Sequence, residues 1–231
     1  RGLGDVYKRQ MLFQVYMLFL VVWCAIIFKE DIARLLNRFL PKLSFLVKWI
    51  TACERVMGAT EVILFILAAV LGAYTGFLLS ALISYPMLNN PVLPALFLAS
   101  GTSSGIAATF LFILIAGRLK GDSHESHFIH KFEVPIMVTE LGLIVCFFVG
   151  LYFGGGQKVV ALENAFSGFW GAVFWIGVML IGIIIPLLAN LAAKAELKYN
   201  RNFIIIVSIC DLIGVLCLRY YILYAGQLTV A

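Results

Sequence analysis

Long apolar runs, separated by short polar segments, dominate the chain. Six of them reach about 18 residues or more, the length that an α-helix needs to cross the hydrocarbon core of a bilayer. These runs cover residues 11–28, 61–84, 93–116, 132–152, 170–191 and 203–224. The pattern predicts an all-α protein, a polytopic transmembrane helix bundle with six spans. The second run can start as early as Val56, and Pro186 is expected to kink the fifth run near its end.

Residues 1–10, RGLGDVYKRQ, do not match the apolar sequence that starts abruptly at Met11. They lack the apolar core and the small-residue cleavage site of a signal peptide. We interpret them as a foreign or misassembled leader and take residues 11–231 as the transmembrane domain. On this interpretation the chain lacks its natural beginning and corresponds to a C-terminal portion of a longer protein.

Composition supports a membrane protein, since 63% of the residues are hydrophobic and only 13% are charged. A soluble domain has about 25% charged residues. The formal net charge of +5 does not indicate nucleic-acid binding, because the basic residues lie mainly between the apolar runs. In that position they set the orientation of the spans in a lipid membrane.

Loop charge predicts the orientation. The first, third and fifth loops together hold 12 Lys and Arg residues, whereas the second and fourth loops and the C-terminal tail hold one, Lys158. Basic loops stay in the cytoplasm, so the odd-numbered loops are expected inside and the C-terminus outside. The membrane is expected to be a bacterial inner membrane.

Ionisable residues within or beside the spans are the main candidates for chemistry, because a charge in lipid is costly. Glu140 and Asp211 each lie about eight residues from the cytoplasmic end of their span, roughly 12 Å deep at 1.5 Å per residue. Glu61 lies near the cytoplasmic edge, at a depth close to that of Asn190. These four residues are candidates for a proton relay that rises from the cytoplasm. The alternative is structural: the two deep carboxyl groups hydrogen bond to neighbouring helices, and Glu61 is solvated at the interface.

Arg219 lies alone in the outer half of the membrane, where it is expected to reach outward or to pair with a carboxylate. The serines of SGTSSG, at 100–105, are expected to make close interhelical contacts or to line a polar path.

Cofactor sites within this chain are not expected. The three histidines, His124, His127 and His130, lie in one polar segment and none lies in a span, which disfavours a bis-histidine haem site. The five cysteines contain no CxxC motif, so an iron–sulfur or zinc site is also disfavoured. We therefore predict no bound metal.

Residues 72–108 form the most distinctive segment, GAYTGFLLSALISYPMLNNPVLPALFLASGTSSGIAA. It predicts two membrane helices joined by a proline-rich turn. The small-residue pairs Gly72/Gly76 and Gly101/Gly105 are typical of close helix packing in lipid. This segment, with LRYYILYAGQ at 218–227, resembles the polysulfide reductase membrane-subunit family, also called NrfD-like.

The resemblance covers about residues 56–227 and implies a haem-free membrane subunit. Such subunits exchange electrons between quinone or quinol, as substrate of the whole complex, and an iron–sulfur partner that serves a further catalytic redox subunit. The family fold has eight or more helices, so this chain resembles a portion without the first helices. Met87 departs from the pattern, since members often have tryptophan there. The alternatives are a secondary transporter, although no internal repeat is evident, and a purely structural membrane anchor.

The orientation can be tested with a reporter enzyme fused after Ala231. The charge bias predicts activity of a periplasmic reporter and none of a cytoplasmic reporter at that position. The opposite pattern would refute the orientation.

Overall fold

The computed structural model of the protein describes residues 2–30, 32–34, 50–51, 55–115, 124–192 and 200–228. These residues are helical apart from short turns, which confirms the all-α prediction. Within them, six segments are long and apolar enough to cross a membrane: Gln10–Ile27, Met57–Ser80, Leu93–Ile115, Phe132–Phe153, Gly168–Ala192 and Arg201–Gln227. The protein is a multi-pass membrane protein.

The protein divides into two compact units, Arg1–Gly72 and Ala73–Ala231. The first contains α1 (Gly2–Ile27) and most of α4 (Met57–Ser80). Helix α1 passes through residues 2–10 without a break at Met11. The interpretation of these residues as a foreign leader stays a prediction.

Helix α4 begins and ends four residues earlier than the predicted span 61–84. At its end, the Ser80 hydroxyl donates to the carbonyl of Phe77 at 2.9 Å, a local bond that competes with continued helix hydrogen bonding. Pro86 then restricts Tyr85 to non-helical conformations. Residues 81–92 are therefore a turn segment, which is longer than the sequence pattern predicted.

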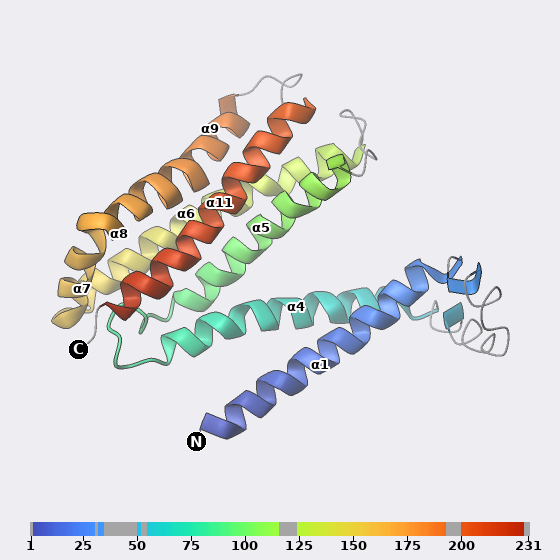
Figure 1. Cartoon of the computed structure of the whole chain (residues 1–231), viewed down its shortest axis with the longest axis horizontal. Coiled ribbons are helices and arrows are strands. Elements are labelled where there is room, and N and C mark those ends of the chain that lie inside the picture. Colours follow the sequence, from blue (N-terminus) through green and yellow to red (C-terminus); the bar gives the residue numbers. More distant parts are fainter. Residues whose placement is uncertain are drawn as a thin grey trace. The chain divides into compact units, whose positions relative to one another are not determined.

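The second unit is a helix bundle. It contains α5 (Leu93–Ile115), α6 (His124–Phe153), the short α7 (Gln157–Phe166), a composite span and α11 (Arg201–Gln227). The composite span consists of α8 (Gly168–Ala172), the π-helix η2 (Val173–Ile184) and α9 (Ile185–Ala192). Figure 1 shows that α6 and α11 begin at the end of the bundle where α5 and α9 finish. Helices α6 and α11 are thus parallel to each other and antiparallel to α5.

Buried positions recur every three or four residues on the three helices that form the bundle centre, the spacing of a continuous helix–helix seam. On α5 the buried stripe is Leu93, Leu96, Ser100, Ser103, Ala107, Phe110 and Leu114. On α6 it is Glu133, Met137, Glu140, Ile144, Phe147 and Leu151. On α11 it includes Ile204, Ser208, Asp211, Val215, Leu218, Ile222 and Ala225. Polar residues therefore share the same stripes as the apolar core.

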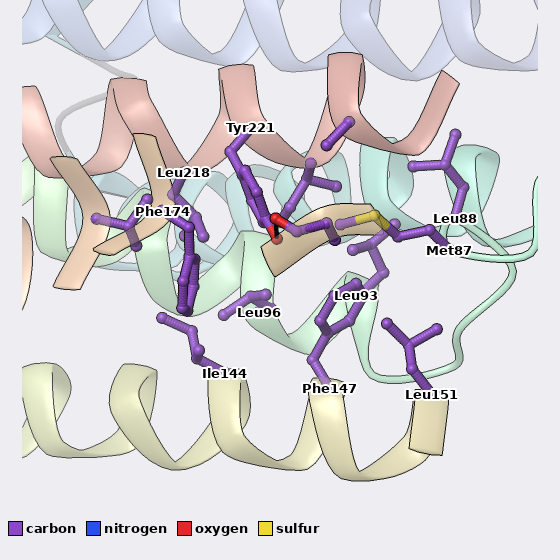
Figure 2. Packing of buried hydrophobic residues seen from close by; sticks show 14 of the residues in the cluster. Met87, Leu88, Leu93, Leu96, Ile144, Phe147, Leu151, Phe174, Leu218 and Tyr221 are labelled. Atoms are coloured by element: carbon purple, nitrogen blue, oxygen red, sulfur yellow. Dashed lines mark hydrogen bonds between the residues drawn. The ribbon is translucent and has the colours of Figure 1, made fainter. Parts of the chain in front are cut away.

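Most of the buried apolar side chains form one group, which we call the main apolar cluster. It contains Met87, Leu88, Leu93, Leu96, Phe97, Ile144, Phe147, Leu151, Ala161, Ala165, Phe174, Val178, Ile183, Leu218, Tyr221, Ile222 and Ala225. Figure 2 shows side chains of α6 facing those of α5 and α11 across this cluster. Tyr221 is fully buried, and its hydroxyl donates to the carbonyl of Ala165 at 3.1 Å, so its polar end is satisfied.

The turn segment 81–92 folds over one end of this cluster. Met87 and Leu88 are buried there, and Leu88 lies so close to Gly226 that a side chain at 226 would collide with it. The Asn90 amide donates to the carbonyl of Phe147 at 2.9 Å and accepts from the backbone of Val92 at 3.0 Å. The predicted role of Asn90 in the polar chemistry of this turn is therefore a bond to α6.

The fifth span widens into η2 directly before Pro186. The N–H of Ile185 donates to the carbonyl of Leu180, five residues back, as in a π-helix. Gly182 of η2 lies against Gly214 of α11, where a Cβ on either residue would meet the backbone of the other. Two glycines thus let this span and α11 approach closely, and the pair fixes their antiparallel register.

Candidate functional site

Buried polar side chains gather in the middle of the bundle, and we call this group the polar band. Its members are Ser100 and Ser103 on α5, Glu133 and Glu140 on α6, Asn190 on α9, and Ser208 and Asp211 on α11. Along α5 and α11 the band lies between the main apolar cluster and a small apolar cluster of Phe110, Leu114 and Ile204. The band is therefore a polar layer with apolar packing at both ends.

The strongest contact in the band joins α5 to α11. The hydroxyl of Ser103 lies 2.9 Å and 3.0 Å from the two carboxyl oxygens of Asp211. Both side chains are buried, with 4% and 3% of their surface exposed. A buried carboxyl group requires such a partner, because an unpaired one costs several kcal/mol in an apolar medium.

Glu140 reaches the same layer from α6. It is 3% exposed, and its carboxyl group interacts with Asp211, Arg219 and the hydroxyl of Ser103. The two carboxyl residues that the sequence placed at equal depth are thus brought together around one serine. Glu133, two turns away on the same face of α6, is also buried and is close enough to Asp211 to act on it electrostatically.

Arg219 is half-buried on α11 and turns back toward α5. Its Nη2 donates to the carbonyl of Phe97 at 3.1 Å and lies 3.5 Å from the Ser100 hydroxyl. Its guanidinium carbon lies 4.8 Å from the centre of the Phe97 ring, a cation–π contact. Together with its interaction with Glu140, these contacts agree with the predicted pairing to a carboxylate rather than with a purely outward position.

Asn190 lies on α9, whose helix contacts α6 and α11. It is 2% exposed, and neither polar atom of its amide has a hydrogen-bond partner among the described residues. Glu61 differs from the other candidates. It is exposed in the first unit, where its carboxylate accepts a bond of 3.3 Å from the indole N–H of Trp23. The structure therefore provides no contact between Glu61 and the polar band.

Comparison with known proteins places the protein in a family. A family profile described as "Polysulphide reductase, NrfD" matches residues 6–231. The protein belongs to this family. The protein named "Protein NrfD homolog" of Haemophilus influenzae is 79% identical over 221 residues, which is 96% of the present sequence and 69% of that protein. "Protein NrfD" of Escherichia coli is 47% identical over 224 residues, with the same coverage of each.

A third relative is more distant. It is a polysulfide reductase protein of Wolinella succinogenes, whose name makes it one of the lettered polypeptides of that enzyme. It is 39% identical over 168 residues, which is 72% of the present sequence and 53% of the relative. The family resemblance found in the sequence is confirmed. Since the sequence spans about two thirds of the first two relatives, it also agrees with the expectation of a partial chain.

The glycines that suggested helix packing in this NrfD-family protein differ in their surroundings. A Cβ on Gly76 would collide with the backbone of Leu93 and Pro94, so this glycine permits a close approach to the start of α5. A Cβ on Gly101 would lie 3.6 Å from the Arg219 guanidinium. Gly105 has open space around it, and Gly72 makes an interaction within the described part of the protein.

No group of three His, Cys, Asp or Glu residues arranged to hold a metal occurs among the described side chains. The histidines at 124, 127 and 130 begin α6, but their side chains lie outside the described set.

The sequence reasoning missed three members of the polar band. Ser103 was expected only to pack closely or line a polar path, whereas it is the direct partner of Asp211. Glu133 and Ser208 were not singled out as buried groups. A signal for them exists, because Glu133 is seven residues from Glu140 and Ser208 is three from Asp211, both on one helix face.

Replacing Ser103 tests the central contact. The change Ser103→Ala removes the hydrogen-bond donor of buried Asp211, so we expect a loss of about 1–3 kcal/mol of stability. Ser104→Ala is the matched control, because the Ser104 hydroxyl only bonds to Gly101 within its own helix. Thermal unfolding of the purified full-length protein in detergent measures both. Equal melting temperatures for the two variants would contradict a special role of Ser103.

Proposed function

We propose that this protein is part of the membrane subunit of a respiratory reductase. In this role the subunit exchanges electrons between the quinone pool and an iron–sulfur partner, which serves a further catalytic redox subunit. Membership in the NrfD family supports the proposal. The Wolinella relative is by name one polypeptide of polysulfide reductase, which indicates an enzyme of several subunits. We place the subunit in a bacterial inner membrane with its C-terminus outside, following the loop charges.

The observation that carries the proton part of this proposal is the buried group of Asp211, Ser103 and Glu140. Reduction of a quinone to a quinol takes up protons as well as electrons, so a quinone-linked membrane subunit needs groups that hold and pass protons. Carboxyl groups and hydroxyls do this, since a hydroxyl both donates and accepts and rotates to suit its partner. Ser103 contacts both carboxyl groups and is suited to transfer a proton between them.

Charge balance in the polar band favours the same function. The band and its neighbour Arg219 contain three carboxyl groups and one guanidinium among the described side chains. Full ionisation would leave excess negative charge inside the membrane, which is costly. We therefore infer that the band holds at least one exchangeable proton on a carboxyl group, with Arg219 compensating the charge that remains.

Electron exchange with quinone is tested in the intact complex of the full-length protein with its partners. Turnover driven by quinol, or by a quinone acceptor in the reverse direction, should be inhibited by a quinone analogue. A control assay with a soluble redox dye that acts directly on the catalytic subunit should be unaffected. A complex without quinone-dependent activity would overturn the proposal and leave a transporter or a structural anchor.

The proton relay is tested by Glu140→Gln and Asp211→Asn, which keep the shape of each side chain and remove its transferable proton. We expect normal assembly and quinone-linked turnover slowed by at least about tenfold, toward the roughly 10²-fold effect of losing a proton-transfer group. Glu163→Gln, at an exposed site on α7, is the matched control and should be neutral.

A solvent isotope effect distinguishes transport of protons from structural support. The relay predicts a larger slowing in D₂O for the two variants than for the wild type. Full turnover of both variants across the pH range would contradict the relay. Assembled variants that are slow but show an unchanged isotope effect would assign the carboxyl groups a structural role.

A further inference from the structure

The polar band can be divided into layers along the bundle axis. Ser103, Glu140 and Asp211 form one layer. Seven residues further on each stripe, toward the small apolar cluster, lie Phe110 on α5, Glu133 on α6 and Ile204 on α11. Between these two layers lies a middle layer, to which the same stripes contribute Ala107, Met137 and Ser208.

Asn190 belongs to the middle layer. Gly182 of η2 lies against Gly214 of α11, and the two spans run antiparallel. Asn190 is eight residues after Gly182 and therefore lies level with the residue about eight before Gly214, close to Ser208. Its helix contacts both α6 and α11, and its side chain is 2% exposed, so the amide faces the bundle interior.

The middle layer differs chemically from the clusters on either side. Met137 is 1% exposed, yet it belongs to neither apolar cluster. Ala107 and Ser208 are small side chains, which leave more space than the Phe and Leu residues of the apolar layers. Both polar atoms of the Asn190 amide lack a partner among the described residues. Buried amides are almost always hydrogen bonded, and ordered water serves where protein groups do not.

We propose that Asn190 binds buried water in the middle layer, between Glu133 and the Ser103–Asp211–Glu140 group. The amide offers one acceptor and two donors, and Ser208 adds a hydroxyl in the same layer. Water bound there joins the carboxyl group of Glu133 to the Asp211 layer by hydrogen bonds. The inference extends the proposed proton function, because it assigns water as the ligand that continues the relay past Met137. Its structural content, a wet middle layer, does not depend on quinone chemistry.

Met137 and Met87 provide an internal reporter and its control. X-ray radiolysis converts water into hydroxyl radicals in place, and methionine sulfur near bound water is oxidised even when it is shielded from bulk solvent. Met137 lies in the proposed wet layer, whereas Met87 is 0% exposed within the main apolar cluster. In the intact complex of the full-length protein we expect rapid oxidation of Met137 and little of Met87, measured by mass spectrometry of the peptides.

Variants then test whether Asn190 holds the water. Asn190→Leu keeps the approximate size and removes hydrogen bonding, so oxidation of Met137 should fall to the level of Met87. Asn202→Leu makes the same change at an exposed position on α11 and should leave Met137 oxidation unchanged. Asn190→Ser retains hydrogen bonding and should keep Met137 reactive.

Three results would overturn the assignment. Protection of Met137 equal to that of Met87 in the wild type would show a dry layer. Unchanged oxidation of Met137 in Asn190→Leu would show that Asn190 does not hold the water. Loss of Met137 oxidation in Asn190→Ser would show that hydrogen bonding at residue 190 is not what holds it. The wild-type comparison needs no variant to fold, and none of these readouts requires quinone-dependent turnover, so a failure here is distinct from failure of the proposed function.

Discussion

The hydrogen bond between Ser103 and Asp211 is the interaction on which the rest of the bundle centre depends. A carboxyl group in the middle of a membrane span has no bulk water, so a neighbouring helix must satisfy it. Ser103 meets this need from α5, and the same hydroxyl contacts Glu140 from α6. One small polar residue thus ties three helices together and brings two acidic groups into one layer.

The arrangement follows from helix periodicity. A repeat of three and four residues places polar and apolar residues on the same inward stripe of α5, α6 and α11. Apolar clusters at both ends exclude lipid and solvent from the polar band, and the contact between Gly182 and Gly214 brings the composite span against α11. Low polarity around the band strengthens each hydrogen bond within it and raises the cost of any unsatisfied group. These conditions are suited to groups that must hold a proton until a partner accepts it.

Much of this arrangement could be predicted from the sequence, because hydrophobic length alone specifies a membrane span. The depth argument grouped Glu140 with Asp211, since depth depends only on position along two parallel helices. It also grouped Asn190 with Glu61, and here depth was not enough: Glu61 bonds to Trp23 in the first unit, whereas Asn190 lies in the bundle. Which residues share a layer depends on how the helices rotate about their axes. The π-helix before Pro186 could not be predicted, because it results from close packing on α11 as well as from the proline.

The most direct test of the account is infrared difference spectroscopy of the intact full-length complex as the quinone pool is reduced and reoxidised. If Asp211 and Glu140 exchange protons with the redox reaction, carboxyl C=O bands should appear and disappear with the redox state. Those bands should shift in D₂O, lose one component each in Asp211→Asn and Glu140→Gln, and persist in Glu163→Gln. A difference spectrum with no carboxyl band assignable to either residue would contradict the central claim that the buried acidic group takes part in proton transfer.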